Sequence, residues 1–132
     1  MSSLWGNVEG DGIAVNVTAM VDKIKTHPDY AKVGMILCHV GIVRGTSRDG
    51  RAVSGLDLTA DHEVLKAVLS KQKARKEIVE ILVEIAEGPL RVGDEVMALV
   101  VAGDLRDHVI PVLEDTLNAI KKDVTAKTEH FV

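Results

Sequence analysis

Aromatic side chains are almost absent from this sequence. They make up 2% of its residues and are Trp5, Tyr30 and Phe131. A surface that stacks successive bases of single-stranded nucleic acid needs several such rings, so that class of protein is excluded. The formal net charge of −4 also argues against binding to a nucleic-acid backbone. Since hydrophobic residues still amount to 46% of the chain, the core must be built from aliphatic side chains.

Cysteine and long apolar runs are scarce as well. Cys38 stands alone, which rules out an internal disulfide framework and fits a reducing compartment. It lies in the apolar segment VGMILCHVGIV, which predicts a buried side chain. No segment reaches the roughly 18 apolar residues of a membrane span, and the N-terminus lacks a basic stretch leading into an apolar signal core. We therefore expect a cytoplasmic protein with no membrane contact, and the length predicts a single domain, 1–132.

Signatures of common cofactor sites are missing. The glycines at 41, 45 and 50 surround a predicted hairpin rather than a helix start, so they form neither a Walker loop nor a dinucleotide fingerprint. The five histidines lack the spacing of metal ligands, and no serine stands in a nucleophile elbow. The sequence predicts neither a metal nor an organic cofactor.

Hydrophobic periodicity and turn residues predict the element order β–α–β–β–α–β–β–α. The first strand is expected at 12–17, followed by a helix that Pro28 ends. A buried strand at 32–45 is followed by a turn at Asp49-Gly50 and by its partner strand, 52–58. Asp61 is predicted to cap a helix from His62 to about Lys76.

The second half of the chain contains one ambiguous segment. Residues 78–86 alternate like a strand, but their glutamates also fall on one helical stripe; the β-branched residues favour the strand. GPLRVGD is expected to be a turn, and EVMALVVAG a buried strand. The last helix starts at Asp104 or Asp107 and runs to about Lys122, with Pro111 tolerated if it lies in the first turn. Hairpins mixed with about three helices predict an α+β fold with a mixed or antiparallel sheet.

Basic residues gather at the ends of predicted elements. Arg44 directly follows a strand, Arg106 lies at the start of the last helix, and the lysines at 121, 122 and 127 lie at its end. Cations suit a helix C-terminus, so the lysines alone are explained as a solvated tail. Arg106 opposes the helix dipole instead, which indicates a bound anion.

Four segments, in order, resemble the large, catalytic subunit of molybdopterin synthase. HVGIVRGTSRDGRAVSGLDL resembles the family's glycine-x-valine-arginine strand, loop and return strand. GPLRVGDEVMALVVAG resembles its second strand pair, the helix from Arg106 to Lys121 aligns without a gap, and AKTE stands where the family has Trp-Lys-Lys-Glu. The resemblance spans roughly residues 33–130 and implies an α/β-hammerhead-like fold.

The resemblance implies sulfur transfer. In the family, a small ubiquitin-like sulfur-carrier subunit inserts its Gly-Gly thiocarboxylate tail into the large subunit and delivers sulfur to cyclic pyranopterin monophosphate. Carried over by position, Lys121 and Lys127 are the expected catalytic amines, and Arg44 and Arg106 the expected phosphate clamps. The expected partners are the small subunit and a second copy of this chain, as a homodimer within a heterotetramer.

Two departures leave an alternative open. Leu105 replaces the family's histidine, so His108 is the nearest imidazole for the phosphate. DVTA replaces the bulky segment before the second lysine and is one residue short, so Lys122 can stand in for Lys121. Residues 121–127 are expected to be mobile without ligand. The alternative to the sulfurtransferase is a non-catalytic homologue that acts as a dimeric binding or regulatory protein.

Overall fold

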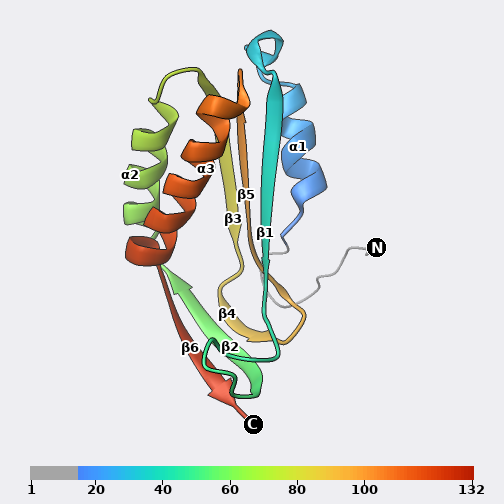
Figure 1. Ribbon diagram of the computed structural model, residues 1–132, viewed down its shortest axis with the longest axis vertical. Helices are drawn as coiled ribbons and strands as arrows, with labels where there is room; N and C mark the ends of the chain where they lie inside the picture. Colours follow the sequence, from blue (N-terminus) through green and yellow to red (C-terminus); the bar gives the residue numbers. More distant parts are fainter. Residues whose placement is uncertain (1–14) are drawn as a thin grey trace.

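The computed structural model describes residues 15–132, which form three α-helices and two antiparallel three-stranded sheets (Figure 1). Sheet 1 has the strand order β1–β5–β3, and sheet 2 has the order β4–β2–β6. The fold is therefore α+β, as predicted. The elements are α1 Val17–Lys25, η1 Tyr30–Lys32, β1 Met35–Ile42, β2 Val53–Ala60, α2 His62–Lys73, β3 Ile78–Ile85, β4 Gly88–Arg91, β5 Glu95–Gly103, α3 Arg106–Ala119, the π-helical turn η2 Ile120–Val124 and β6 Thr125–Phe131.

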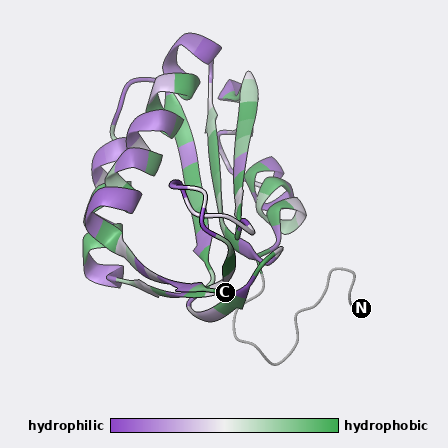
Figure 2. Ribbon diagram, turned by 60° about the horizontal axis from the view of Figure 1, so that its bottom comes forward, coloured by the Kyte–Doolittle hydropathy of each residue, from purple (hydrophilic) through white to green (hydrophobic). Residues whose placement is uncertain are grey.

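Sheet 1 lies between two helical layers, with α1 on one face and α2 and α3 on the other (Figure 1). Its central strand, β5, is covered on both sides, and residues 98–102 are fully buried. Leu99 and Val101 pack towards α3 and η2, whereas Val100 packs against Ile24 of α1. Because both faces of β5 are covered, its sequence is a continuous apolar run rather than an alternating one. The hydrophilic faces of α2 and α3 point outwards (Figure 2).

Sheet 2 extends from the end of sheet 1 and carries the C-terminus (Figure 1). β2 is its central strand and pairs with β4 on one side and with β6 on the other. Leu56 and Leu58 of β2 are buried in the same core cluster as Leu99 and Ile120. This shared cluster joins sheet 2 to sheet 1 and to the end of α3.

The predicted strand pairing between 32–45 and 52–58 is wrong. β1 belongs to sheet 1 and β2 to sheet 2, and only an isolated bridge between Thr46 and Ala52 joins the two segments. The Asp49-Gly50 turn does form, with Gly50 at φ 89°. Before this turn, the Val43 amide donates to the Asp94 carbonyl at 2.9 Å. The residues that follow β1 therefore pair with the β4–β5 turn. The turn residues predict the loop but not the strands that pair.

Several element ends also differ from the predictions. For the predicted strand 12–17, residues 12–14 lie outside the described part, and Asn16 caps α1 by accepting from the Ala19 amide at 3.0 Å. α2 is capped by Asp61 as predicted but ends at Lys73, because the chain must reverse into β3 and does so with Glu77 at φ 62°. β3 confirms the strand interpretation of 78–86.

The C-terminal half contains two strands that the sequence did not predict. GPLRVGD is not only a turn, since its first four residues form β4. α3 starts one residue before Asp107 and ends at Ala119, and Pro111 is its sixth residue, beyond the first turn. The segment after α3 is not a mobile tail but the strand β6, which pairs along β2.

Cys38 is exposed, contrary to the prediction of a buried thiol. It lies on β1, which is an edge strand of sheet 1. Its partner in register, Val100 of β5, is fully buried. An apolar sequence context predicts the strand, but exposure depends on whether the strand is central or at the edge.

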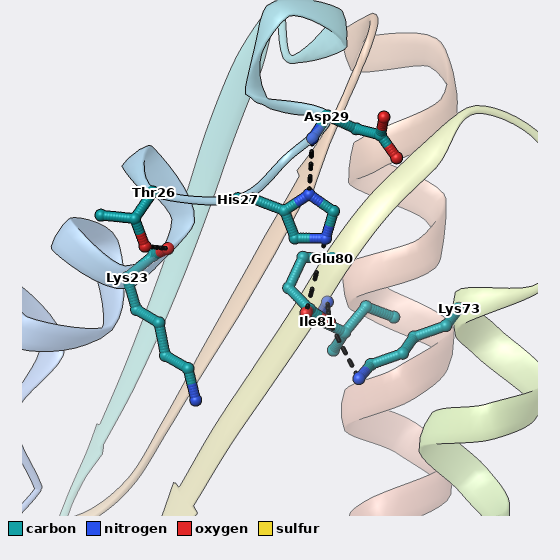
Figure 3. Close-up of polar contacts among 7 residues, drawn as sticks. All are labelled: Lys23, Thr26, His27, Asp29, Lys73, Glu80 and Ile81. Atoms are coloured by element: carbon teal, nitrogen blue, oxygen red, sulfur yellow. Dashed lines mark hydrogen bonds and ion pairs between the residues drawn. The ribbon is translucent and has the colours of Figure 1, made fainter.

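A polar cluster fastens α1 and α2 to β3 (Figure 3). Glu80 of β3 accepts from Lys73 Nζ at 2.8 Å, and its second oxygen lies 3.9 Å from His27 Nε2. The His27 ring is oriented because its Nδ1 accepts from the Asp29 amide at 3.0 Å. Burial alone raises the pKa of Glu80, but the hydrogen bonds from Lys73 and the Ile81 amide outweigh it, and the pKa is lowered overall.

Candidate functional site

Lys121 is held at the end of α3 by its neighbours in the π-helical turn. Ile120 and Val124 are buried at 0% and 5% exposure, which anchors both ends of η2 in the core. The residues between them, Lys121, Lys122 and Asp123, are exposed. Lys121, and not Lys122, lies close enough to His39 of β1 for its charge to lower the pKa of that imidazole.

His39 lies beside Leu99 in sheet 1, on the face that packs towards α3 and η2. Burial lowers the pKa of His39 most, and the nearby Lys121 ammonium lowers it further. The imidazole is therefore neutral near pH 7. Its Nε2 atom is buried and has no hydrogen-bond partner among the described residues.

Arg44 follows β1 at the end where sheet 1 meets sheet 2. The backbone on either side of it is fixed, because the Val43 amide donates to Asp94 at 2.9 Å and the Gly45 carbonyl accepts from the Val53 amide at 2.9 Å. The Arg44 side chain is exposed. β1 thus runs from His39 towards an exposed guanidinium.

Lys127 lies on β6, opposite Leu58 of β2. Directly opposite residues of an antiparallel pair share one face of the sheet, so Lys127 is on the face that carries the buried Leu58. That face is turned towards η2, since Leu58 and Ile120 belong to one core cluster. Lys127 is itself exposed, with Nζ 3.8 Å from Glu129 Oε2.

Arg106 and His108 lie at the other end of sheet 1. Met35 pairs with Gly103 and Ile42 pairs with Glu95, so α3 begins beside the start of β1, whereas Arg44 follows its end. An eight-residue strand spans about 23 Å at 3.3 Å per residue. Within one chain, Arg44 and Arg106 are therefore too far apart to share one anion.

His108 is engaged with a carboxylate. Its Nδ1 lies 2.6 Å from Asp104 Oδ1, and this hydrogen bond is the main reason that the pKa of Asp104 is lowered. The same oxygen accepts from the Leu105 amide at 2.6 Å. His108 thus pairs with a carboxylate at the start of α3, where the N-cap residue Leu105 makes no side-chain hydrogen bond.

The structure brings Lys121 and His39 together, and it turns the side of sheet 2 that bears Lys127 towards them. Sequence reasoning missed His39, which it considered only as a possible metal ligand. The signal was a polar residue inside the apolar run of β1, two positions before Gly41. In the described residues, no group of three or more His, Cys, Asp or Glu side chains is arranged to hold a metal ion. Nor does the described part contain a helix long and apolar enough to cross a membrane.

These features define an α+β protein of two antiparallel sheets, with exposed basic side chains after β1, in η2 and on β6. The family of the MoaE protein matches residues 14–123. The chain therefore belongs to the MoaE family, that of the large subunit of molybdopterin synthase. The matched region contains Arg44, Arg106 and Lys121 but ends before Lys127.

Solved structures share the fold at low sequence identity. A molybdopterin cofactor biosynthesis protein E from Burkholderia multivorans is 22% identical, with a TM-score of 0.72, over 91% of this chain and 85% of that one. A molybdopterin synthase from Staphylococcus aureus is 19% identical, with a TM-score of 0.67, over 76% and 77%. A complex of subunits 1 and 2 of the molybdopterin-converting factor from Helicobacter pylori is 17% identical, with a TM-score of 0.67, over 90% and 85%. No curated protein matches the chain.

Proposed function

We propose that this chain is the catalytic subunit of a cytoplasmic molybdopterin synthase. A small ubiquitin-like partner presents the thiocarboxylate of its Gly-Gly tail, and its sulfur passes to cyclic pyranopterin monophosphate while the tail is left as a carboxylate. Two such transfers, from two thiocarboxylated partners, supply the two sulfur atoms of the molybdopterin dithiolene. The observation that carries this proposal is the position of Lys121, on a turn anchored in the core beside His39, in a chain of the MoaE family.

The basic side chains take separate roles in this proposal. Lys121 and Lys127 are the amines that act as base or nucleophile, for which they must lie within hydrogen-bond reach of the substrate. Arg44 binds the pterin phosphate, because a guanidinium fork matches two phosphate oxygens. Lys122 lies next to Lys121 in the exposed part of η2 and supplies a further cation for the phosphate.

Arg106 reaches such a site only from a second copy of the chain. Two exposed apolar side chains flank it, Leu105 at 57% and Ile110 at 48% exposure. Near Arg44, at the opposite end of sheet 1, Ile42 and Val92 are exposed at 49% and 45%. In a two-fold dimer, a contact between one end of a copy and the other end of its partner is repeated in reverse, so both ends can be covered. We therefore propose a homodimer in which the second copy's Arg106 joins Arg44, with one small subunit bound to each copy.

Reconstitution with a thiocarboxylated Gly-Gly partner and the pterin precursor tests the activity. The unmodified chain is expected to form the dithiolene product, and Lys121→Ala is expected to abolish it. Lys66→Ala removes an exposed lysine of α2 and serves as the matched control. Full activity of Lys121→Ala would contradict the catalytic assignment.

A second candidate function is supported by Leu105, which has no hydrogen-bond donor in its side chain where the family has a histidine. A non-catalytic homologue would bind the small partner without turnover. Binding of the partner by the unmodified chain with no product, under conditions in which a known synthase is active, would favour this alternative.

Complementation tests the shared site. Arg44→Ala and Arg106→Ala are each expected to be inactive as homodimers. In a mixed dimer one site carries both substitutions and the other carries none, so random mixing should restore about a quarter of the wild-type activity. If the two variants stay inactive after mixing, although mass spectrometry shows mixed dimers, the two arginines do not meet across the dimer.

A further inference from the structure

His39 differs from every other histidine of the described chain in what it faces. The other four each lie near a carboxylate, in the pairs His27–Glu80, His62–Glu87, His108–Asp104 and His130–Asp57. His39 has no carboxylate partner and lies near the Lys121 ammonium instead. A cation beside an imidazole does not stabilise its protonated form. The surroundings of His39 therefore suit a negative group that residues 15–132 do not supply.

The unpartnered atom of His39 borders a small notch over Gly41. A β-carbon placed on Gly41 would lie 3.7 Å from His39 Nε2, 3.8 Å from Met97 Cγ and 3.9 Å from Val96 Cβ. These are ordinary contact distances, so the notch has room for about one heavy atom. Glycine leaves this space open, and it is bordered by one polar atom and two aliphatic ones.

Burying a hydrogen-bonding atom without a partner is costly, so buried polar groups in folded proteins are nearly always paired. His39 Nε2 is an exception here, although the residues on both sides of His39 pair in register with β5. A cost of this kind is offset when a ligand supplies the missing partner. The ligand atom must be an acceptor if Nε2 carries the proton, and the adjacent ammonium favours an acceptor with negative charge.

We propose that His39 is a substrate-binding residue whose Nε2 donates a hydrogen bond to an anionic oxygen that Lys121 also contacts over Gly41. The proposal rests on the proposed function, in which Lys121 acts on the bound substrate. Two substrates carry such an oxygen: the C-terminal carboxyl group of the Gly-Gly tail and the phosphate of the pterin. The chemistry that His39 recognises is the same in both cases, and titration with separate probes distinguishes them.

Imidazole NMR spectra of the full chain test the contact directly. The His39 signals are assigned by their loss in His39→Gln, and the pKa of His39 is then measured alone, with inorganic phosphate, and with a peptide that ends in Gly-Gly. We expect one of the two probes to raise the pKa of His39, because a bound anion favours the protonated ring. A response to phosphate alone identifies the pterin phosphate, and a response to the peptide alone identifies the tail. No shift with either probe at saturation of the chain would overturn the proposal.

The position of Lys121 has its own spectroscopic test. Lys121→Met removes the charge that lowers the pKa of His39, so the pKa should rise, whereas Lys122→Met should leave it unchanged. An equal response to both substitutions would show that Lys121 is not the lysine beside His39, and would overturn the shared contact.

Three variants test the role of His39 in binding. His39→Phe is expected to weaken binding of the responding probe by about tenfold, the usual effect of one lost hydrogen bond to a charged group, and His39→Gln to recover part of that loss. Gly41→Ala fills the notch without a steric clash and should weaken binding while the chain stays folded. Unchanged binding in both His39→Phe and Gly41→Ala would contradict the proposal. If the probes bind through His39 but no dithiolene forms, the binding role stands and the sulfurtransferase function fails.

Discussion

Leu58 of β2 and Lys127 of β6 lie opposite one another in the antiparallel ladder of sheet 2. One is buried in the core cluster, and the other is exposed on the same face of the sheet. This register places Lys127 on the side of the sheet that faces the end of α3. The return of the chain depends on pairing between strand backbones, and no bulky side chain in DVTA is needed for it.

Lys127→Ala should therefore leave the fold intact and abolish sulfur transfer. The side chain is exposed, and its ion pair with Glu129 at 3.8 Å contributes at most about 0.5 kcal/mol. Urea unfolding and the reconstituted reaction measure the two effects. Thr128→Ala, one position along the same strand, is the control. A Lys127→Ala variant that keeps full activity would exclude this lysine from catalysis.

Gly34 is expected to tolerate no side chain. A β-carbon there would lie 2.0 Å from the Asp104 carbonyl oxygen, at the point where the Gly34 amide donates to Gly103 at 2.8 Å. Gly34→Ala must displace backbone and should cost about 2–3 kcal/mol of unfolding free energy. Gly45→Ala, whose nearest contact is a side-chain carbon at 3.7 Å, should cost far less. Equal unfolding free energies for the two variants would show that the junction of β5 and α3 is looser than described.

Glu80→Gln should lower stability at neutral pH by about 0.5–1 kcal/mol, because Lys73 and His27 lose their carboxylate. The pKa of Glu80 is below its ordinary value of 4.5 in the folded chain. The ionised Glu80 carboxylate therefore contributes to the free energy of unfolding above pH 4.5, and this contribution is lost as the pH falls through the lowered pKa. Urea unfolding at pH 7 and at decreasing pH should show the wild type and Glu80→Gln converging in acid. Glu114→Gln, at an exposed position of α3, is the control for the loss of a surface carboxylate.

Pro111→Ala should stabilise the chain. Pro111 is the sixth residue of α3, and its side chain is exposed. Because proline has no backbone N–H, the Asp107 carbonyl lacks its helical donor. Alanine restores that hydrogen bond and removes the ring clash, for an expected gain of about 1–3 kcal/mol in unfolding free energy. Calorimetry measures the rise in melting temperature. An unchanged or lower melting temperature would mean that Pro111 makes a compensating contact, for instance in a dimer.

Local patterns predicted much of the fold. The apolar run of β5, the β-branched residues of β3 and the Asp61 cap of α2 each specify an element through the nearby chain alone. β6 escaped prediction because TAKTEHF has no alternating apolar pattern, and it becomes a strand only because β2 offers it an edge. Cys38 was placed wrongly for a related reason, since its exposure depends on the position of β1 in the sheet.

The candidate site also has features that the sequence predicts and others that depend on how distant segments pack. The basic residues and the family can be recognised in the sequence, because the residue types and their spacing around Arg44, Arg106 and Lys121 are local features. Which of these side chains lie close together depends on the tertiary structure. The antiparallel register of β1 and β5 separates Arg44 from Arg106 by the length of a strand, and the anchored turn after α3 brings Lys121 to His39. Such proximities depend on strand order and packing between distant segments, which no local pattern encodes.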